Sequence, residues 1–166
     1  VLTVMKIAAA LERSGDHAKN LAKRTAVLAQ LSPVPGASGA IRRLAKAVVQ
    51  MLTDALDAYI RRDVKLAEDV RARDRDIDQM YNTLFRSLFT YMMENPANIG
   101  PSMHLHFIAK NIERAGDHAT TIAEQVLYLA TGEIPSEPRP KAGMDADRNI
   151  SQAEIDVVGG DGGFAQ

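Results

Sequence analysis

Cysteine and tryptophan are absent from this 166-residue chain, and aromatic residues make up only 5% of it. Without cysteine there can be no disulfide framework and no thiolate metal ligand. A bound metal would have to be held by carboxylate oxygens or imidazole, which favours a hard cation. The chain is nevertheless 46% hydrophobic, so it can bury one ordinary core.

An excess of charge of one sign is also missing, because 20 basic and 21 acidic residues leave a formal net charge of −1. Such a balance gives no general attraction to nucleic acid, and we expect no nucleic-acid partner. There is no recognisable signal peptide and no apolar run near the roughly eighteen residues that span a bilayer. The cytoplasm is therefore the expected location.

Proline and glycine are concentrated in a few short stretches that separate four helical segments. The periodicity predicts helices over residues 1–31, 40–61, 63–94 and 101–131, with apolar or small residues spaced alternately three and four apart. Asp63 is a plausible cap for the third helix, Pro96 ends it, and Gly132 fits the position just past the fourth. No segment alternates with a period of two. The sequence thus predicts an all-α, up-down helical bundle.

The two ends of the chain differ in character. Residues 133–166 are rich in Pro, Gly, Asp and Ser, and we expect most of this tail to be disordered. The first residue, Val1, is not Met and lies already within an amphipathic pattern, so we interpret the chain as a fragment.

A fourteen-residue motif occurs twice. The stretch "LERSGDHAKNLAKR" at residues 11–24 returns as "IERAGDHATTIAEQ" at residues 112–125, with seven identical positions. Such a gapless match indicates an internal duplication. Each copy carries a Glu-x-x-x-Asp pair and a glycine inside a predicted helix.

The acidic pairs of the motif are Glu12 with Asp16 and Glu113 with Asp117. Helical geometry places both pairs on the outward face, where acids four residues apart repel each other slightly. The motif has two interpretations. In the plain interpretation it is a solvated helix face with a glycine that allows close packing. In the functional interpretation it is a site for one or two hard cations, since two carboxylates one turn apart can bind them.

A third acidic pair, Asp74 and Asp78, lies in the predicted third helix, and Asp74 falls on its apolar stripe. A buried aspartate is costly unless it is paired or coordinated, so a salt bridge is the alternative to a metal. If the third and fourth helices fold back near residue 97, Asp78 lies 19 residues before the turn and Asp117 lies 20 after it. At 1.5 Å per residue they lie at similar heights, and four carboxylates can converge.

The histidines point less clearly to chemistry. His17 and His118 follow the motif aspartates but point elsewhere, so surface or interhelix hydrogen-bonding roles are favoured over metal ligation. His106 shares a stripe with Glu113 and Asp117 and is a weak ligand candidate. No ferritin-like Glu-x-x-His, Walker loop, dinucleotide motif or nucleophile elbow is visible, so we predict that the protein is not an enzyme.

The double Glu-Arg-x-Gly-Asp motif, together with "RDRDIDQMYNTLFRSLFTYMMENPANI" between its copies, closely resembles the PhoU family of phosphate-signalling regulators over residues 1–133. That family consists of two tandem three-helix bundles. The resemblance implies that residues 1–32 are the last helix of an incomplete first bundle. Residues 38–132 would be a complete second bundle, and residues 133–166 a tail.

The resemblance also implies a function and a ligand set. It implies a cytoplasmic negative regulator that links the phosphate transporter ATPase subunit to a sensor histidine kinase and meets the membrane only through its partners. The absent helices would leave apolar surface uncovered, which predicts a homo-oligomer. The resemblance implies a cluster of iron, zinc or another divalent cation, held by Asp74, Asp78, Glu113 and Asp117 and less surely by Glu12 and Asp16. A carboxylate-bridged metalloenzyme and a purely structural helical module are the alternatives.

Overall fold

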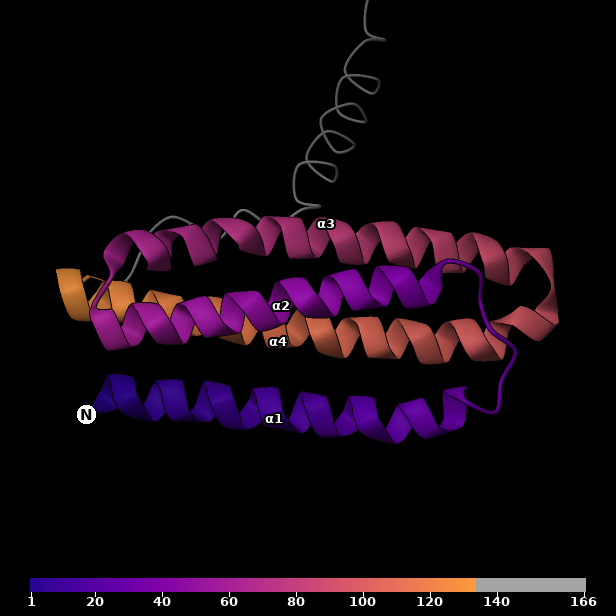
Figure 1. Cartoon of the computed structure of the whole chain (residues 1–166), viewed down its shortest axis with the longest axis horizontal. Helices are drawn as coiled ribbons and strands as arrows, with labels where there is room; N and C mark the ends of the chain where they lie inside the picture. The colour runs from indigo at the N-terminus through magenta and orange to yellow at the C-terminus, as the bar shows by residue number, and fades with distance from the viewer. Residues whose placement is uncertain (134–166) are drawn as a thin grey trace, which may run out of the picture.

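The computed structural model describes residues 1–133, which form four long helices and, within that range, no strand (Figure 1). In order these are α1 (Leu2–Leu28), α2 (Ala37–Arg61), α3 (Val64–Glu94) and α4 (Ile99–Thr131), with a short 3₁₀ helix, η1 (Pro96–Asn98), before α4. The all-α prediction is confirmed. The prediction of a disordered tail falls on residues 134–166, outside the described range.

Local signals fix several helix ends. The Asp63 carboxylate accepts a hydrogen bond from the Leu66 N–H at 3.0 Å and caps α3, as predicted. Gly132 ends α4 with a φ of 78°, a left-handed conformation that glycine adopts without strain. Between α2 and α3 the chain reverses at Arg62, whose φ is 56°. Arg62 and Asp63 thus make the short turn between α2 and α3, and Gly132 ends the last helix.

Three helix ends differ from the predicted ones by two or three residues. α1 ends at Leu28, α2 already begins at Ala37, and α4 already begins at Ile99 rather than at Pro101. Pro101 lies in the first turn of α4, where its missing N–H would have had no helical partner in any case. The turn around Pro96, which was predicted to end the third helix, is therefore shorter than the sequence suggested.

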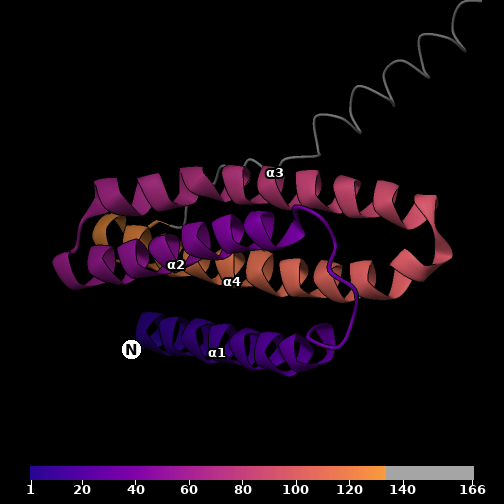
Figure 2. The ribbon, with the colours of Figure 1, turned by 45° about the vertical axis from the view of Figure 1, so that its right-hand side comes forward.

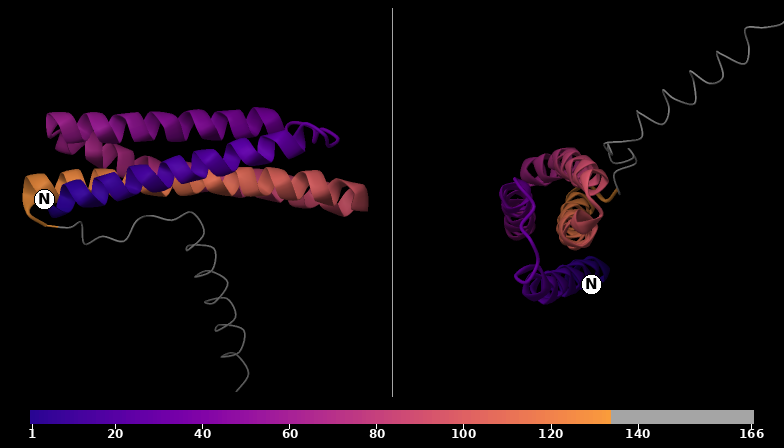
Figure 3. Two further views of the ribbon diagram at one scale, coloured as in Figure 1. Left: turned by 90° about the horizontal axis from the view of Figure 1, so that it is seen from below. Right: turned by 90° about the vertical axis from the view of Figure 1, so that its right-hand side faces the viewer.

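α4 is the central helix of the molecule. It packs against α1, α2 and α3, and α2 also packs against α3. Viewed along the long axis, α2, α3 and α4 form a three-helix bundle, and α1 lies outside it against α4 (Figure 3). Within the described residues α1 packs on no helix other than α4. Figure 2 shows the same separation of α1 from the bundle.

The core lies inside the three-helix bundle and continues between α4 and the first half of α1. Its largest fully buried side chains are Leu44, Met51, Val70, Ile77, Leu88, Ile122 and Val126. α1 contributes only four buried residues, Thr3, Ile7, Ala10 and Ser14, and exposes several large apolar side chains, namely Leu2, Val4, Met5, Leu11 and Val27. None of the helices among residues 1–133 has the length and apolar character needed to cross a membrane.

Candidate functional site: the acidic motifs

Asp74 lies on the inner face of α3, where it is only 2% exposed. The sequence placed it on the apolar stripe, and the structure confirms this. Its Oδ1 accepts a hydrogen bond from the Thr120 hydroxyl of α4 at 3.0 Å. A hydroxyl from the neighbouring helix thus compensates part of the cost of burying this carboxylate.

Thr120 is the partner that sequence reasoning missed. It is fully buried, and its hydroxyl also lies 3.2 Å from the Gly116 carbonyl oxygen one turn earlier. The signal was present in the chain, because Asp74 lies 23 residues before Ala97 (97 − 74) and Thr120 lies 23 after it (120 − 97). Asp74 and Thr120 therefore lie at the same height on α3 and α4, by the same count along the helices that matches Asp78 with Asp117.

The outward orientation predicted for Glu113 is wrong. Its side chain is only 9% exposed, and its Oε2 lies 2.8 Å from the Lys110 ammonium one turn earlier. The prediction assumed that α4 has a single buried seam, whereas α4 packs against three helices and buries most of its circumference. Glu113 therefore already has a cationic partner in the Lys110 ammonium.

Asp78 and Asp117 are half-buried, and each makes further polar or electrostatic contacts. Among residues 1–133 no group of three or more His, Asp or Glu side chains is arranged to hold a metal ion. Asp74 is bound to Thr120, and Glu113 to Lys110. The metal site predicted at Asp74, Asp78, Glu113 and Asp117 therefore stays a prediction, and among residues 1–133 the four carboxylates do not form a preassembled cluster.

The two motif glycines meet different surroundings. A Cβ on Gly116 would lie 3.4 Å from a methyl group of Ile77 on α3 and 3.4 Å from one of Val48 on α2. Gly116 therefore lets α4 approach both helices closely, as the plain interpretation of the motif expected. A Cβ on Gly15 would have no heavy atom within 4 Å. The same residue type thus has a packing role in the second copy and open space around it in the first.

The first acidic pair is solvent-exposed, since both Glu12 and Asp16 are exposed on α1. The outward orientation predicted for this pair is therefore confirmed. Because α1 packs only on α4 among the described helices, no other helix of residues 1–133 reaches these two carboxylates.

The histidines of the two motif copies meet between α1 and α4. The rings of His17 and His118 stack with centroids 5.4 Å apart and an interplanar angle of 17°. His17 Nδ1 also lies 2.9 Å from the Asn111 side-chain oxygen of α4. The predicted interhelix hydrogen-bonding role of His17 is confirmed, and equivalent positions of the duplication contact each other.

His106 lies against Tyr81 rather than among carboxylates. Its Nδ1 is 3.5 Å from the Tyr81 hydroxyl, and the ring centroids are 6.0 Å apart. Burial lowers the pKa of His106 below its ordinary 6.5, and the positive charge of Lys110 lowers this pKa further. Burial also raises the pKa of Tyr81, while the Lys110 ammonium acts in the opposite direction. These surroundings favour a neutral imidazole and a neutral phenol at pH 7.

An ion-pair network fastens α2 to α3. The Arg73 guanidinium lies 2.7 Å from Asp54 on α2 and 2.8 Å from Asp69 on its own helix. Burial raises the pKa of Asp54, but hydrogen bonds from Arg73 and Gln50 and the charge of Arg73 outweigh it, so the net pKa lies below the ordinary value. This network is structural, since it links two helices away from the motif.

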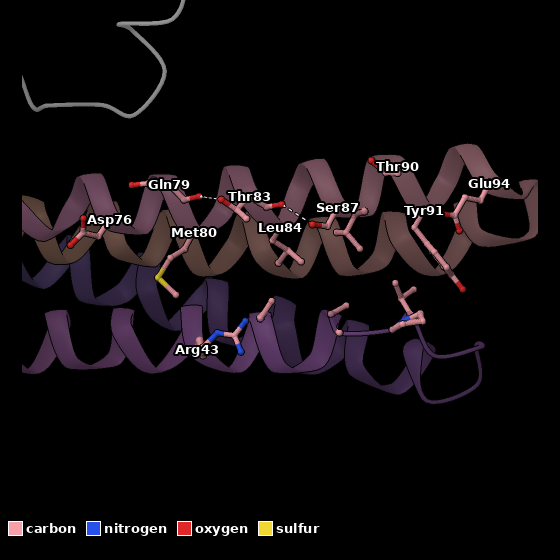
Figure 4. Close-up of a pocket in the computed structure, with 16 residues that line it drawn as sticks. Arg43, Asp76, Gln79, Met80, Thr83, Leu84, Ser87, Thr90, Tyr91 and Glu94 are labelled. Atoms are coloured by element: carbon pink, nitrogen blue, oxygen red, sulfur yellow. Dashed lines mark hydrogen bonds between the residues drawn. The ribbon is translucent and has the colours of Figure 1, made fainter.

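A groove of about 880 Å³ lies between the start of α2 and the second half of α3 (Figure 4). Leu84 and Met80 line it together with alcohol side chains from α3. The Thr83 and Ser87 hydroxyls donate to carbonyl oxygens one turn earlier in their own helix, at 2.9 and 3.1 Å. The groove is of mixed character, because Arg43, Asp76 and Glu94 also line it, and its lining includes none of the motif carboxylates.

Comparison with known proteins assigns a family to this architecture. Residues 41–126 match the PhoU domain. The chain is 46% identical over 144 residues to a "Phosphate-specific transport system accessory protein PhoU homolog" of Rhizobium meliloti, and 45% identical over 140 residues to one of Caulobacter vibrioides. These alignments cover 87% and 84% of this chain and 61% of each relative. The chain thus spans about three fifths of the length of these relatives.

Solved structures agree with the sequence matches. The crystal structure of PhoU from Pseudomonas aeruginosa is similar with a TM-score of 0.77 and 37% identity, covering 80% of this chain and 63% of that one. The phosphate transport system regulatory protein PhoU from Streptococcus pneumoniae is similar with a TM-score of 0.72 and 27% identity, covering 82% and 64%. With its helical bundle, its two Glu-Arg-x-Gly-Asp motifs and this level of identity, the chain belongs to the PhoU family.

Proposed function

We propose that this chain is part of a phosphate-transport accessory protein that acts by binding other proteins rather than by catalysis. In this role it is a cytoplasmic negative regulator that links the phosphate transporter ATPase subunit to a sensor histidine kinase. Membership of the PhoU family supports the proposal, as do relatives named as accessory or regulatory proteins of phosphate transport.

The observation that carries the proposal is the side-by-side packing of the two motif copies. α1 and α4 each carry one copy, they pack together, and His17 stacks on His118 across their contact. This brings the two copies of the motif together at the contact between α1 and the bundle, and it leaves Glu12 and Asp16 exposed for contact with another molecule.

No observation favours the metalloenzyme alternative. A carboxylate-bridged enzyme needs several acids that converge on its metal ions. Here Asp74 accepts from Thr120, and Glu113 is paired with Lys110. The repeat argues against a purely structural module. Both copies of the motif keep the aspartate, which is exposed in the first copy and half-buried in the second.

Co-purification tests the proposal. The tagged chain is co-expressed with the phosphate transporter ATPase subunit and the sensor kinase of the same genome, and with an unrelated ABC ATPase and an unrelated kinase as controls. We expect retention of the phosphate proteins alone. The experiment is repeated with a version as long as the relatives, because this chain spans only about 61% of them. Failure of the longer version to retain either protein contradicts the proposal.

A further inference from the structure

Five ring side chains of α3 and α4 lie next to one another. We define the aromatic patch as Tyr81, Phe85 and Phe89 of α3 with His106 and Phe107 of α4. Successive ring centroids along the patch lie 5.1–6.4 Å apart, within the range of attractive ring contacts. The whole chain has four phenylalanines, and three of them belong to this patch.

The phenylalanines of the patch are open to solvent. Phe85 is 39% exposed, Phe89 is 53% exposed and Phe107 is 40% exposed. The patch lies in the half of α3 and α4 nearest η1, at the end opposite Gly132 (Figure 1). A group of exposed aromatic residues on a bundle marks a binding surface, because leaving it in water forfeits the free energy of burial.

Cations lie against the patch. The Arg24 guanidinium of α1 lies 4.4 Å from the Phe107 ring centroid, and the Lys110 ammonium lies 4.9 Å from that of Tyr81. Both positions are typical of cation–π contacts. Lys110 is already paired with Glu113, so Arg24 supplies the positive charge of the patch. The patch therefore suits a segment that combines apolar side chains with negative charge.

Such a segment exists in this chain. Residues 150–158, "ISQAEIDVV", carry Glu154 and Asp156 between apolar residues, and no lysine or arginine occurs anywhere in residues 149–166. We propose that residues 150–158 bind the aromatic patch of their own chain, with apolar side chains on the phenylalanines and acidic ones toward Arg24. The proposal does not depend on the proposed function.

The connecting segment is long enough. Phe107 lies 24 residues before the end of α4 at Thr131 (131 − 107), which is about 36 Å along the helix. Ile150 lies 17 residues beyond Glu133 (150 − 133), so the connection spans up to about 56 Å when extended.

The chain's own tail is favoured over a second copy of the patch. Two patches face to face would bring their Arg24 side chains together, whereas the acids of residues 150–158 complement this charge. Attachment to the same chain also gives the tail an effective concentration near the millimolar range, so that modest affinity is sufficient.

Photo-crosslinking of the full chain tests the proposal. Phe89 is replaced by p-benzoyl-phenylalanine, the protein is irradiated, and the crosslinked peptides are identified by mass spectrometry. We expect crosslinks to residues 150–158 within one molecule, as judged from a mixture of ¹⁴N- and ¹⁵N-labelled protein. The same replacement at Val49, which is 65% exposed on α2, is the control and should give at least about fivefold fewer such crosslinks. Both sites are exposed, so the fold should tolerate the replacements, and circular dichroism verifies this.

Charge variants of the tail sharpen the test. Glu154→Gln with Asp156→Asn should lower the intramolecular yield at Phe89 about threefold or more, since each lost ion pair weakens binding modestly. An unchanged yield would overturn the charge-matched mode of binding. Crosslinks only between molecules would show that a second copy occupies the patch instead. Equal yields at Phe89 and Val49, or no crosslink to the tail at all, would overturn the proposal altogether.

Discussion

Replacing Thr120 with valine should destabilise the protein although it changes the shape of the side chain very little. Thr120 is fully buried, and its hydroxyl lies 3.0 Å from Asp74 Oδ1. Valine cannot donate this hydrogen bond, and removing one partner of a buried polar group costs about 1–3 kcal/mol. The free energy of unfolding should fall by this amount. For a chain of this size that corresponds to a melting temperature about 4–10 °C lower.

Urea unfolding followed by circular dichroism at 222 nm measures the change, and Thr83→Val is the matched control. Thr83 is exposed on α3 and its hydroxyl donates to a carbonyl of its own helix, so this variant should stay within about 0.5 kcal/mol of wild type. A double-mutant cycle of Thr120→Val with Asp74→Asn should show a coupling of about 1 kcal/mol or more. If Thr120→Val costs no more than Thr83→Val, the contact contributes nothing to stability and the reasoning fails.

Four further predictions concern the glycines, the ion pair, α1 and the metal. Gly15→Ala should stabilise the protein by about 0.5–1 kcal/mol in thermal unfolding, whereas Gly116→Leu should cost about 1–3 kcal/mol by overpacking; similar effects at both sites would contradict their different surroundings. Asp54→Asn should cost about 0.5–1 kcal/mol at pH 7 and little below about pH 3. The pKa of Asp54 is lower in the folded state than in the unfolded state, where it is near 3.9, so the ionised carboxylate stabilises the protein above that pH. This stabilisation is lost as the pH falls through the folded-state pKa. A cost of Asp54→Asn that does not depend on pH would refute this. Amides of α1 should exchange with deuterium sooner than those of α3, because α1 packs on α4 alone among the described helices, and equal protection would count against that. If a cation is bound as the sequence suggested, Glu113→Ala with Asp117→Ala should lower the metal content of the purified protein in elemental analysis, and equal content would contradict the assignment.

Much of the fold followed from the sequence, because helices depend on local features. The three-and-four spacing predicted four helices, and Asp63 and Gly132 mark two of their ends as expected. The constant rise of a helix also allowed heights to be compared across the turn near residue 97. That comparison only counts residues from the turn and needs no knowledge of packing. Applied to residues with hydroxyl groups as well, it identifies Thr120 as the partner of Asp74.

The environment of each motif residue was decided by the tertiary structure. The sequence established that Glu-Arg-x-Gly-Asp occurs twice, and equal motifs led to equal expectations. In the fold, however, α4 has three neighbouring helices and α1 has one among the described residues. Glu113 is therefore buried beside Lys110 while Glu12 is exposed, and Gly116 contacts two helices while Gly15 contacts none. Periodicity gives the direction of a side chain from its own helix, but only the number and position of the neighbouring helices determine what it meets there.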